Sequence, residues 1–243
     1  MKILRSLRLA GVFLVPLFLL AGPAAALQEG GGHGNTKTWL ELFETTGPVG
    51  YLMLACSIAG TTLVIEHMVS LRRDKLAPAE LAGEIEALIN EEEYDQATEL
   101  CDENPRYLTN VVGSALRMRD AGYQEMIAGL EAAANEETFK LNTKISYLSL
   151  IGNVAPLLGL LGTVTGMISS FQVIETLKAP TPGDLAKGVY ESLVNTTMGL
   201  FIAILFLTVY FFFKNKVSKM CLSINLQCVD MLRHLAINEK AAA

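Results

Sequence analysis

Three apolar segments without a charged residue constrain the fold of this chain more than any other feature of its sequence. They are Gly47–Ile65, Ile145–Ile174 and Ser192–Phe213. The hydrocarbon core of a bilayer is about 30 Å thick, and roughly 20 consecutive apolar residues of helix cross it. Each segment is long enough to do so. The sequence therefore predicts an all-α integral membrane protein with three transmembrane helices.

The overall composition indicates that a soluble part accompanies these segments. Of the 243 residues, 51% are hydrophobic and 18% are charged, and the mean hydropathy is +0.37. This is too apolar for an ordinary soluble domain and too polar for a chain that lies wholly in the membrane. The net charge of −6 argues against nucleic-acid binding, which requires a basic face.

The second segment carries small residues on one helical stripe. Gly159, Gly162, Thr163, Gly166 and Ser170 are spaced i, i+3, i+4, i+7 and i+11, which places them on one face of a helix. Small residues on one face let another helix backbone approach closely, which is how helices associate in lipid. The residues expected to pack helices are Pro156, Gly159, Gly162, Gly166 and, in the third segment, Gly199.

The third segment has a similar stripe, in which Ser192, Asn195, Thr196 and Gly199 are spaced i, i+3, i+4 and i+7. A polar residue in a span is costly unless it faces a bundle interior or water, so two such stripes suggest a shared polar path. Because three helices are few for a pore, we expect several copies around a central space. The residues expected on the path or facing a partner are Thr163, Glu191, Ser192, Asn195 and Thr196.

A purely structural role is the alternative for each of these side chains. Ser and Thr in membrane helices often hydrogen-bond to the carbonyl four residues earlier and do nothing else. Thr197, which is off the stripe, fits that description, whereas Thr163 and Thr196 lie on small-residue stripes that favour the path. Glu191, one residue before the uncharged segment, is either a path residue or an interfacial carboxylate.

Acidic and basic side chains are missing from the middle of the spans. No Asp, Glu, His, Lys or Arg lies within any of the three segments. Apart from a continuous water wire, a proton crosses such a core only with a titratable group. If the chain belongs to a device that moves protons, that group therefore comes from a partner. The four cysteines have no C-x-x-C spacing and no histidine cluster, so we interpret them as packing residues and expect neither a metal nor a cofactor.

The N-terminus has the pattern of a secretory signal peptide. Lys2, Arg5 and Arg8 precede the apolar run Leu9–Leu20, and small residues end at Ala26, where we expect cleavage. An uncleaved anchor is the alternative. A cleaved signal places the mature N-terminus outside the cytoplasm.

Basic residues next to the three segments predict the same orientation, because Lys and Arg are enriched in cytoplasmic loops. They follow the first segment, precede the second and follow the third, so they share one side if the N-terminus is outside. We therefore predict a multi-pass protein of the bacterial inner membrane with a periplasmic N-terminus and a cytoplasmic C-terminus. The basic residues are Arg72, Arg73, Lys75, Lys140, Lys144, Lys214, Lys216 and Lys219.

The expected organisation has eight parts along the chain. Met126–Lys144 contains no Pro and should continue as one helix into the second span. The helix of the third span should continue beyond it with a coiled-coil-like apolar face. The residues of this face have spacings of four and three and are Val217, Cys221, Ile224, Cys228, Met231 and Leu235. The parts are a signal peptide (1–26), a periplasmic leader (27–46), transmembrane helices (47–70, 145–174 and 188–213), cytoplasmic helical regions (71–144 and 214–243) and a periplasmic loop (175–187).

The three-span layout, the stretch Ala155–Met167 and the pattern Glu191-x4-Thr196-x2-Gly199 resemble the MotA/TolQ/ExbB proton channel family. Three spans are similar to the ExbB/TolQ branch and not to the four-span MotA. The resemblance implies that Thr163 and Thr196 face a partner helix and that Glu191 is the family's acidic residue at the start of the third span. Asn195 and Thr197 depart from the small apolar neighbours that the family usually has there.

The resemblance also implies an assembly and a function. A pentamer of this subunit would surround the single-span helices of an ExbD-like or TolR-like partner dimer, whose membrane Asp takes up and releases the proton. The work would pass through a TonB-like or TolA-like transducer. The implied function is a stator subunit of a motor, driven by the proton-motive force, that energises outer-membrane transport or envelope processes.

Other functional classes fit the sequence less well. A non-conducting membrane scaffold that organises partner helices is the alternative that we keep. A substrate transporter is disfavoured because the chain has no inverted repeat and no charged substrate site in its spans. An enzyme is disfavoured because Gly-x-Ser-x-Gly, His-Glu-x-x-His and a pair of aspartates within the bilayer are all missing from the sequence.

Overall fold

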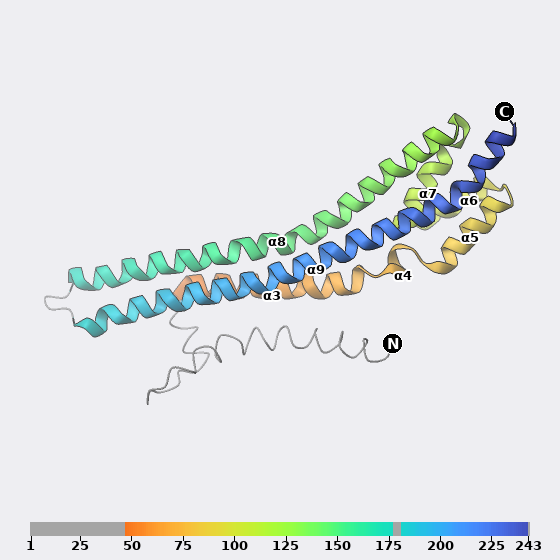
Figure 1. The fold of residues 1–243 in the computed structure, drawn as a ribbon. Coiled ribbons are helices and arrows are strands. Elements are labelled where there is room, and N and C mark those ends of the chain that lie inside the picture. The colour runs from red at the N-terminus through yellow and green to blue at the C-terminus, as the bar shows by residue number, and fades with distance from the viewer. Residues whose placement is uncertain (1–46, 177–180, 243) are drawn as a thin grey trace. The chain divides into compact units, whose positions relative to one another are not determined.

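The structure of the protein is a computed structural model, which describes the backbone of residues 47–176 and 181–242 (Figure 1). Side chains are described for these residues apart from 184, 185, 187 and 234–242. The expected signal peptide at 1–26, the expected leader at 27–46 and residues 177–180 of the expected loop lie outside this part of the chain.

Every regular element of the described chain is a helix. Three of the helices are long and apolar enough to cross a membrane, namely α3, α8 and the portion Gly188–Arg233 of α9. The predicted fold class is confirmed, and the chain is an all-α integral membrane protein with three spanning helices. The elements are α3 (Gly47–Ser70), α4 (Arg73–Leu76), α5 (Ala79–Asn90), α6 (Tyr94–Glu103), α7 (Tyr107–Arg117), the 3-10 turn η1 (Arg119–Ala121), α8 (Tyr123–Thr176) and α9 (Pro182–Ala242).

Two of the spanning helices are far longer than a bilayer requires. α8 has 54 residues and α9 has 61. The prediction that Met126–Lys144 continues as one helix into the second span is confirmed, and α8 runs through Pro156 without interruption. Both helices contribute to each of two compact units. The described parts are residues 47–66, 147–176 and 181–210 in unit 1 and residues 67–146 and 211–242 in unit 2.

Unit 1 contains α3 with the spanning parts of α8 and α9. Its largest buried side chain on α9 is Phe206, which lies against Gly60 of α3. A Cβ placed on Gly60 would lie 2.5 Å from Cζ of Phe206, so the phenylalanine ring packs directly on the glycine of α3. Further buried side chains of the unit are Met53, Val64, Ala155, Val194 and Ile202.

Unit 2 has a core of its own, built on one face of α9. The predicted coiled-coil-like face of α9 is confirmed, because its five described members are at most 3% exposed: Val217, Cys221, Ile224, Cys228 and Met231. The side chain of Leu235 lies outside the described residues. Apolar positions of α5, α7 and α8 complete this core: Ile85, Ile89, Leu108, Val112, Leu116, Met126 and Leu130.

Tyr107 connects three helices of unit 2 through its hydroxyl group. The oxygen lies 3.0 Å from Oγ1 of Thr138 on α8, and the hydroxyl donates a hydrogen bond to Oδ1 of Asn225 on α9 at 2.9 Å. Tyr107 itself begins α7, where the corner after Pro105 is held by Thr109, whose hydroxyl accepts from the Arg106 amide at 2.8 Å. A polar network at the base of the core thus fixes α7 against both long helices.

Candidate functional site

The two small-residue stripes of the sequence lie against each other in unit 1. A Cβ placed on Gly159 would lie 3.1 Å from Cα of Thr196, and one on Gly199 would lie 2.6 Å from the carbonyl oxygen of Ala155. The backbones of α8 and α9 therefore touch where both sides lack a side chain. We call this contact the seam; it comprises Gly159, Gly162 and Gly166 of α8 and Ser192, Asn195, Thr196 and Gly199 of α9.

Ser192 uses its hydroxyl group to join the two helices of the seam. Its Oγ lies 2.7 Å from the carbonyl oxygen of Gly188 on its own helix and 3.2 Å from that of Thr163 across the seam. A Cβ on Gly166 would collide with this same Oγ. Since a hydroxyl has one hydrogen, Ser192 donates to one of the two carbonyls at a time.

The two threonines predicted to face a partner differ in how firmly their hydroxyl groups are held. Oγ1 of Thr163 lies 2.6 Å from the carbonyl oxygen of Leu160, a short bond within α8. Oγ1 of Thr196 lies 3.3 Å from the carbonyl of Ser192 and 3.4 Å from that of Gly159. Distances of this length make weak hydrogen bonds. Thr196 therefore holds the hydroxyl that is most readily redirected to a new acceptor.

Asn195 is the most unusual side chain of the seam. It is 3% exposed, and its Oδ1 is the one buried side-chain polar atom in the described chain that lacks a hydrogen-bond partner. A buried acceptor without a donor costs about 1–3 kcal/mol, and such a cost is rarely retained without a reason. The adjacent Thr197, by contrast, donates to the carbonyl of Leu193 at 2.9 Å, as expected for a threonine off the stripe.

The structure brings four of the five predicted path residues together. Ser192 and Asn195 are buried in the seam, while Thr163 and Thr196 beside them keep partial exposure. Glu191 is also partly exposed, and it forms no ion pair with any described side chain. Pro156 lies in α8, next to Ala155, whose carbonyl oxygen contacts Gly199. The exposed residues of this set are the ones that another chain can reach.

Two further close contacts of unit 1 were not singled out in the sequence. Gly188 approaches α8 so closely that a Cβ there would collide with Oγ of Ser170. A Cβ on Gly152 would lie 2.7 Å from Cγ of Leu207. The heptad spacing of Gly152, Gly159 and Gly166 was an available signal for the second contact.

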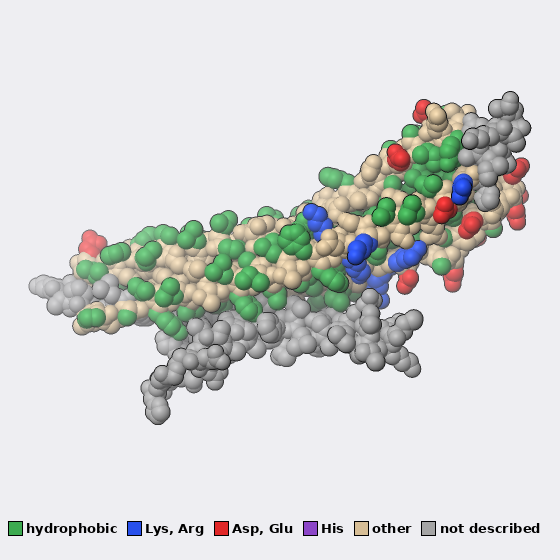
Figure 2. Space-filling view, in the orientation of Figure 1, with side chains coloured by type: hydrophobic (Ala, Val, Ile, Leu, Met, Phe, Trp, Pro, Cys, Tyr) green, Lys and Arg blue, Asp and Glu red, His purple; other side chains and the backbone are tan. Residues whose placement is uncertain are grey.

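The outer surface of the spanning helices is apolar. Figure 2 shows hydrophobic side chains spread over the visible face of these helices. Lipid or neighbouring subunits can cover such a surface, whereas water cannot do so cheaply. The exposed hydrophobic residues include Leu157, Leu160, Leu161, Val164, Ile168 and Phe171 on α8 and Leu193, Leu200 and Ile204 on α9.

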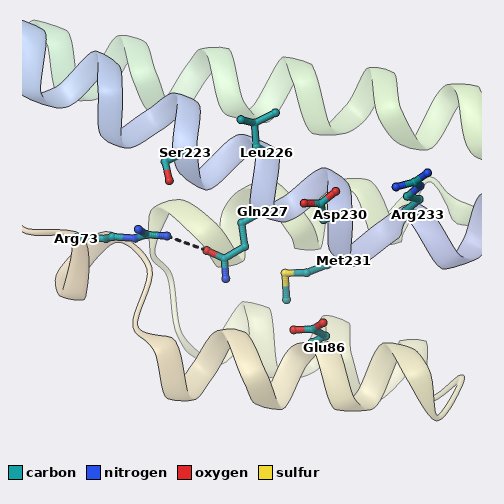
Figure 3. A pocket seen from close by; sticks show the side chains of 8 residues that line it. All are labelled: Arg73, Glu86, Ser223, Leu226, Gln227, Asp230, Met231 and Arg233. Carbon is teal, nitrogen blue, oxygen red and sulfur yellow. Dashed lines mark hydrogen bonds between the residues drawn. The ribbon is translucent and has the colours of Figure 1, made fainter.

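Unit 2 has an open groove of about 700 Å³ between α9 and the segment that contains α4 and α5 (Figure 3). Its lining includes two basic side chains, Arg73 and Arg233, and two acidic ones, Glu86 and Asp230. Nη2 of Arg73 donates to Oε1 of Gln227 at 3.4 Å. These balanced charges do not select a ligand of either sign, and the groove has no nucleophile paired with a base. The seam is therefore the better candidate for function.

Comparison with known proteins shows the family of the chain. The model of the MotA/TolQ/ExbB proton channel family matches residues 103–225, which include all of α8, the seam and much of α9. A putative biopolymer transport protein ExbB homolog of Methanothermobacter thermautotrophicus is 24% identical over 181 residues, which is 74% of this chain and 64% of that protein.

Two relatives with higher identity match over a shorter range. The Tol-Pal system protein TolQ of Pseudomonas aeruginosa is 34% identical over 85 residues, covering 35% of this chain and 37% of the relative. The biopolymer transport protein exbB1 of Vibrio cholerae is 40% identical over 86 residues, again 35% of this chain and 37% of the relative. The chain thus spans between about a third and two thirds of the length of these relatives.

Proposed function

Since the chain belongs to the MotA/TolQ/ExbB proton channel family, we propose that it is a stator subunit of a motor driven by the proton-motive force. Several copies, a pentamer by resemblance to the family, surround the membrane helices of an ExbD-like or TolR-like partner. The work passes through a TonB-like or TolA-like transducer and energises outer-membrane transport or another envelope process. The protein resides in the bacterial inner membrane, with a periplasmic N-terminus and a cytoplasmic C-terminus.

The observation that carries this proposal is the chemistry of the seam. Hydroxyl and amide groups gather between α8 and α9, although the uncharged segments 145–174 and 192–213 contain no Asp, Glu, His, Lys or Arg. Hydroxyl groups can accept and pass on hydrogen bonds, but they do not store a proton near neutral pH. A proton-driven device built on this chain therefore takes its acid from the partner, and the chain supplies the hydroxyl-lined wall.

The partly exposed threonines provide the test. We expect Thr196→Val to abolish proton-driven activity and Thr163→Val to reduce it, while the complex with the partner still assembles. The matched controls are Thr197→Val and Thr165→Val, because these hydroxyls are exposed and donate to carbonyls of their own helices. Activity is measured in cells and assembly by co-purification of the partner. Full activity in both Thr163→Val and Thr196→Val would contradict the proposal.

A non-conducting scaffold is the second candidate, and one observation favours it. The hydroxyl groups of Thr163, Ser192 and Thr196 all form their hydrogen bonds with backbone carbonyl oxygens, as they would if they only stabilised helix packing. Proton flux separates the two functions. Vesicles that contain the chain with its partner acidify in response to a pH gradient if the complex conducts, and a scaffold leaves the flux at the level of protein-free vesicles.

A further inference from the structure

Asn195 lies where a larger residue on the opposite helix would exclude it. A Cβ placed on Gly162 would lie 2.6 Å from Cβ of Asn195 and 2.8 Å from its Cγ and Nδ2. The amide group therefore lies directly over the bare backbone of α8. Its Oδ1 is buried and has no donor among the described residues. The seam thus holds a small-residue stripe together with an unpartnered acceptor that is 3% exposed.

The neighbouring hydroxyl groups do not satisfy this acceptor. Ser192 has a close acceptor in the Gly188 carbonyl at 2.7 Å, and Thr163 has one in the Leu160 carbonyl at 2.6 Å. Thr196, the next residue after Asn195, has only its two long contacts at 3.3 and 3.4 Å. Oδ1 of Asn195 therefore stays without a donor, and the hydroxyl of Thr196 is the most weakly held of the three.

A water molecule has the chemistry that this arrangement requires. It donates two hydrogen bonds and accepts others, and buried waters typically bind polar groups that would otherwise be unsatisfied. A cation would also satisfy oxygen atoms. However, the uncharged segments supply no negative charge for it, and an uncompensated charge in a span is far more costly than a neutral water.

We propose that Asn195 binds a water molecule in the seam and, through it, positions the hydroxyl of Thr196. The water donates to Oδ1 of Asn195 and accepts the hydrogen of Thr196. The lone pairs of Thr196 then point away from the seam, where they accept a hydrogen bond from the protonated acid of the partner. This inference rests on the proposed function, and it makes Asn195 a positioning residue, since it acts on the partner's acid only through Thr196.

The proposal predicts the sign of a pH shift. A hydroxyl that accepts from the protonated acid stabilises the neutral form and keeps the acid's pKa high, whereas a hydroxyl that donates to the carboxylate lowers the pKa. Asn195→Leu, which has similar volume and no acceptor, removes the water and lets Thr196 donate outward. We expect the pH profile of proton flux to move to lower pH by about one unit, which corresponds to one hydrogen bond.

The experiment uses the full chain with its partner in vesicles, with flux recorded from pH 5 to 9. Asn195→Ser retains an acceptor and should restore the wild-type profile, whereas Asn195→Ala should resemble the leucine variant. Asn153→Leu is the matched control, because Asn153 is exposed on α8 and its amide already donates to the Ser149 carbonyl at 2.8 Å. If Asn195→Leu fails to assemble with the partner, the comparison of serine with alanine decides.

The water is detected independently of flux by radiolytic labelling. Met198 is partly exposed and three residues after Asn195, which places it next to Asn195 on the surface of α9. We expect hydroxyl radicals formed from a seam water to oxidise its thioether. Oxidation of Met198 should fall several-fold in Asn195→Leu and remain unchanged in Asn153→Leu.

Three outcomes overturn the inference. The first is equal oxidation of Met198 in Asn195→Leu and Asn153→Leu. The second is an unshifted pH profile in Asn195→Leu. The third is a loss of flux when Na⁺ in the buffer is replaced by K⁺, which would indicate that Asn195 binds a cation. Loss of flux in Thr196→Val together with any of these leaves the proposed function standing. Flux that survives both threonine variants removes the proposed function itself.

Discussion

At the scale of single residues, one buried hydroxyl group contributes to the stability of unit 2. Tyr107 is 2% exposed, and its hydroxyl group joins α7 to α8 and α9. We expect Tyr107→Phe to lower the free energy of unfolding by about 1–2 kcal/mol, because it leaves Asn225 without its donor. Thermal unfolding in detergent measures this, with Tyr51→Phe as the exposed control. Equal melting temperatures for the two variants would contradict the assignment.

The pKa of the same tyrosine predicts how the stability of unit 2 changes at alkaline pH. Burial, the largest cause, raises the pKa of Tyr107 to about 12, above the ordinary value of 10.0. The folded state therefore holds this proton when the unfolded chain has already lost it. Stability is unaffected by Tyr107 below pH 10.0 and falls as the pH rises from there towards 12. Unfolding measured across this range should show a steeper alkaline loss in the wild type than in Tyr107→Phe.

At the scale of elements, the absence of side chains determines how the helices pack. We expect Gly162→Ala to destabilise the seam by about 1–3 kcal/mol, because the new methyl group meets Cβ of Asn195, which cannot move without shifting α9. Gly83 is the matched position on α5, where nothing lies within 4 Å of an added Cβ.

Gly83→Ala should therefore stabilise the protein by about 1 kcal/mol through helix propensity alone. Thermal unfolding of the two alanine variants tests both signs. The contact assigned to the seam is wrong if Gly162→Ala melts at or above the wild-type temperature.

At the scale of the whole molecule, the distribution of charge predicts that this chain does not conduct protons without a partner. The three uncharged segments offer a proton no carboxylate, histidine, lysine or arginine within the hydrocarbon core. We expect the chain alone, reconstituted in vesicles, to show no proton flux above protein-free vesicles. Addition of a partner with an acid in its single span should restore the flux. A pH-sensitive dye inside the vesicles reports both results, and conduction by the chain alone would rule out a partner-supplied acid.

Much of the fold could be predicted because the physics that determines it is local. A segment without charge is recognisable as a span from its length alone, and the four-and-three spacing from Val217 to Met231 marked the buried face of α9. The helix through Met126–Lys144 was also predictable, since nothing in that stretch breaks a helix. The stripes of Thr163 and Thr196 were visible for the same reason, as both are periodic along one helix.

The partner of each stripe was not predictable, because periodicity describes one helix and not its neighbour. The sequence by itself determined that two faces are small and hydroxylic and that the spans lack an acid. Only the tertiary structure decided that these faces meet each other, that Ser192 spans the contact, and that Oδ1 of Asn195 is buried there without a donor. The physical reason is that burial and hydrogen bonding depend on which backbones approach within a few ångströms, and glycines permit such an approach without specifying its partner.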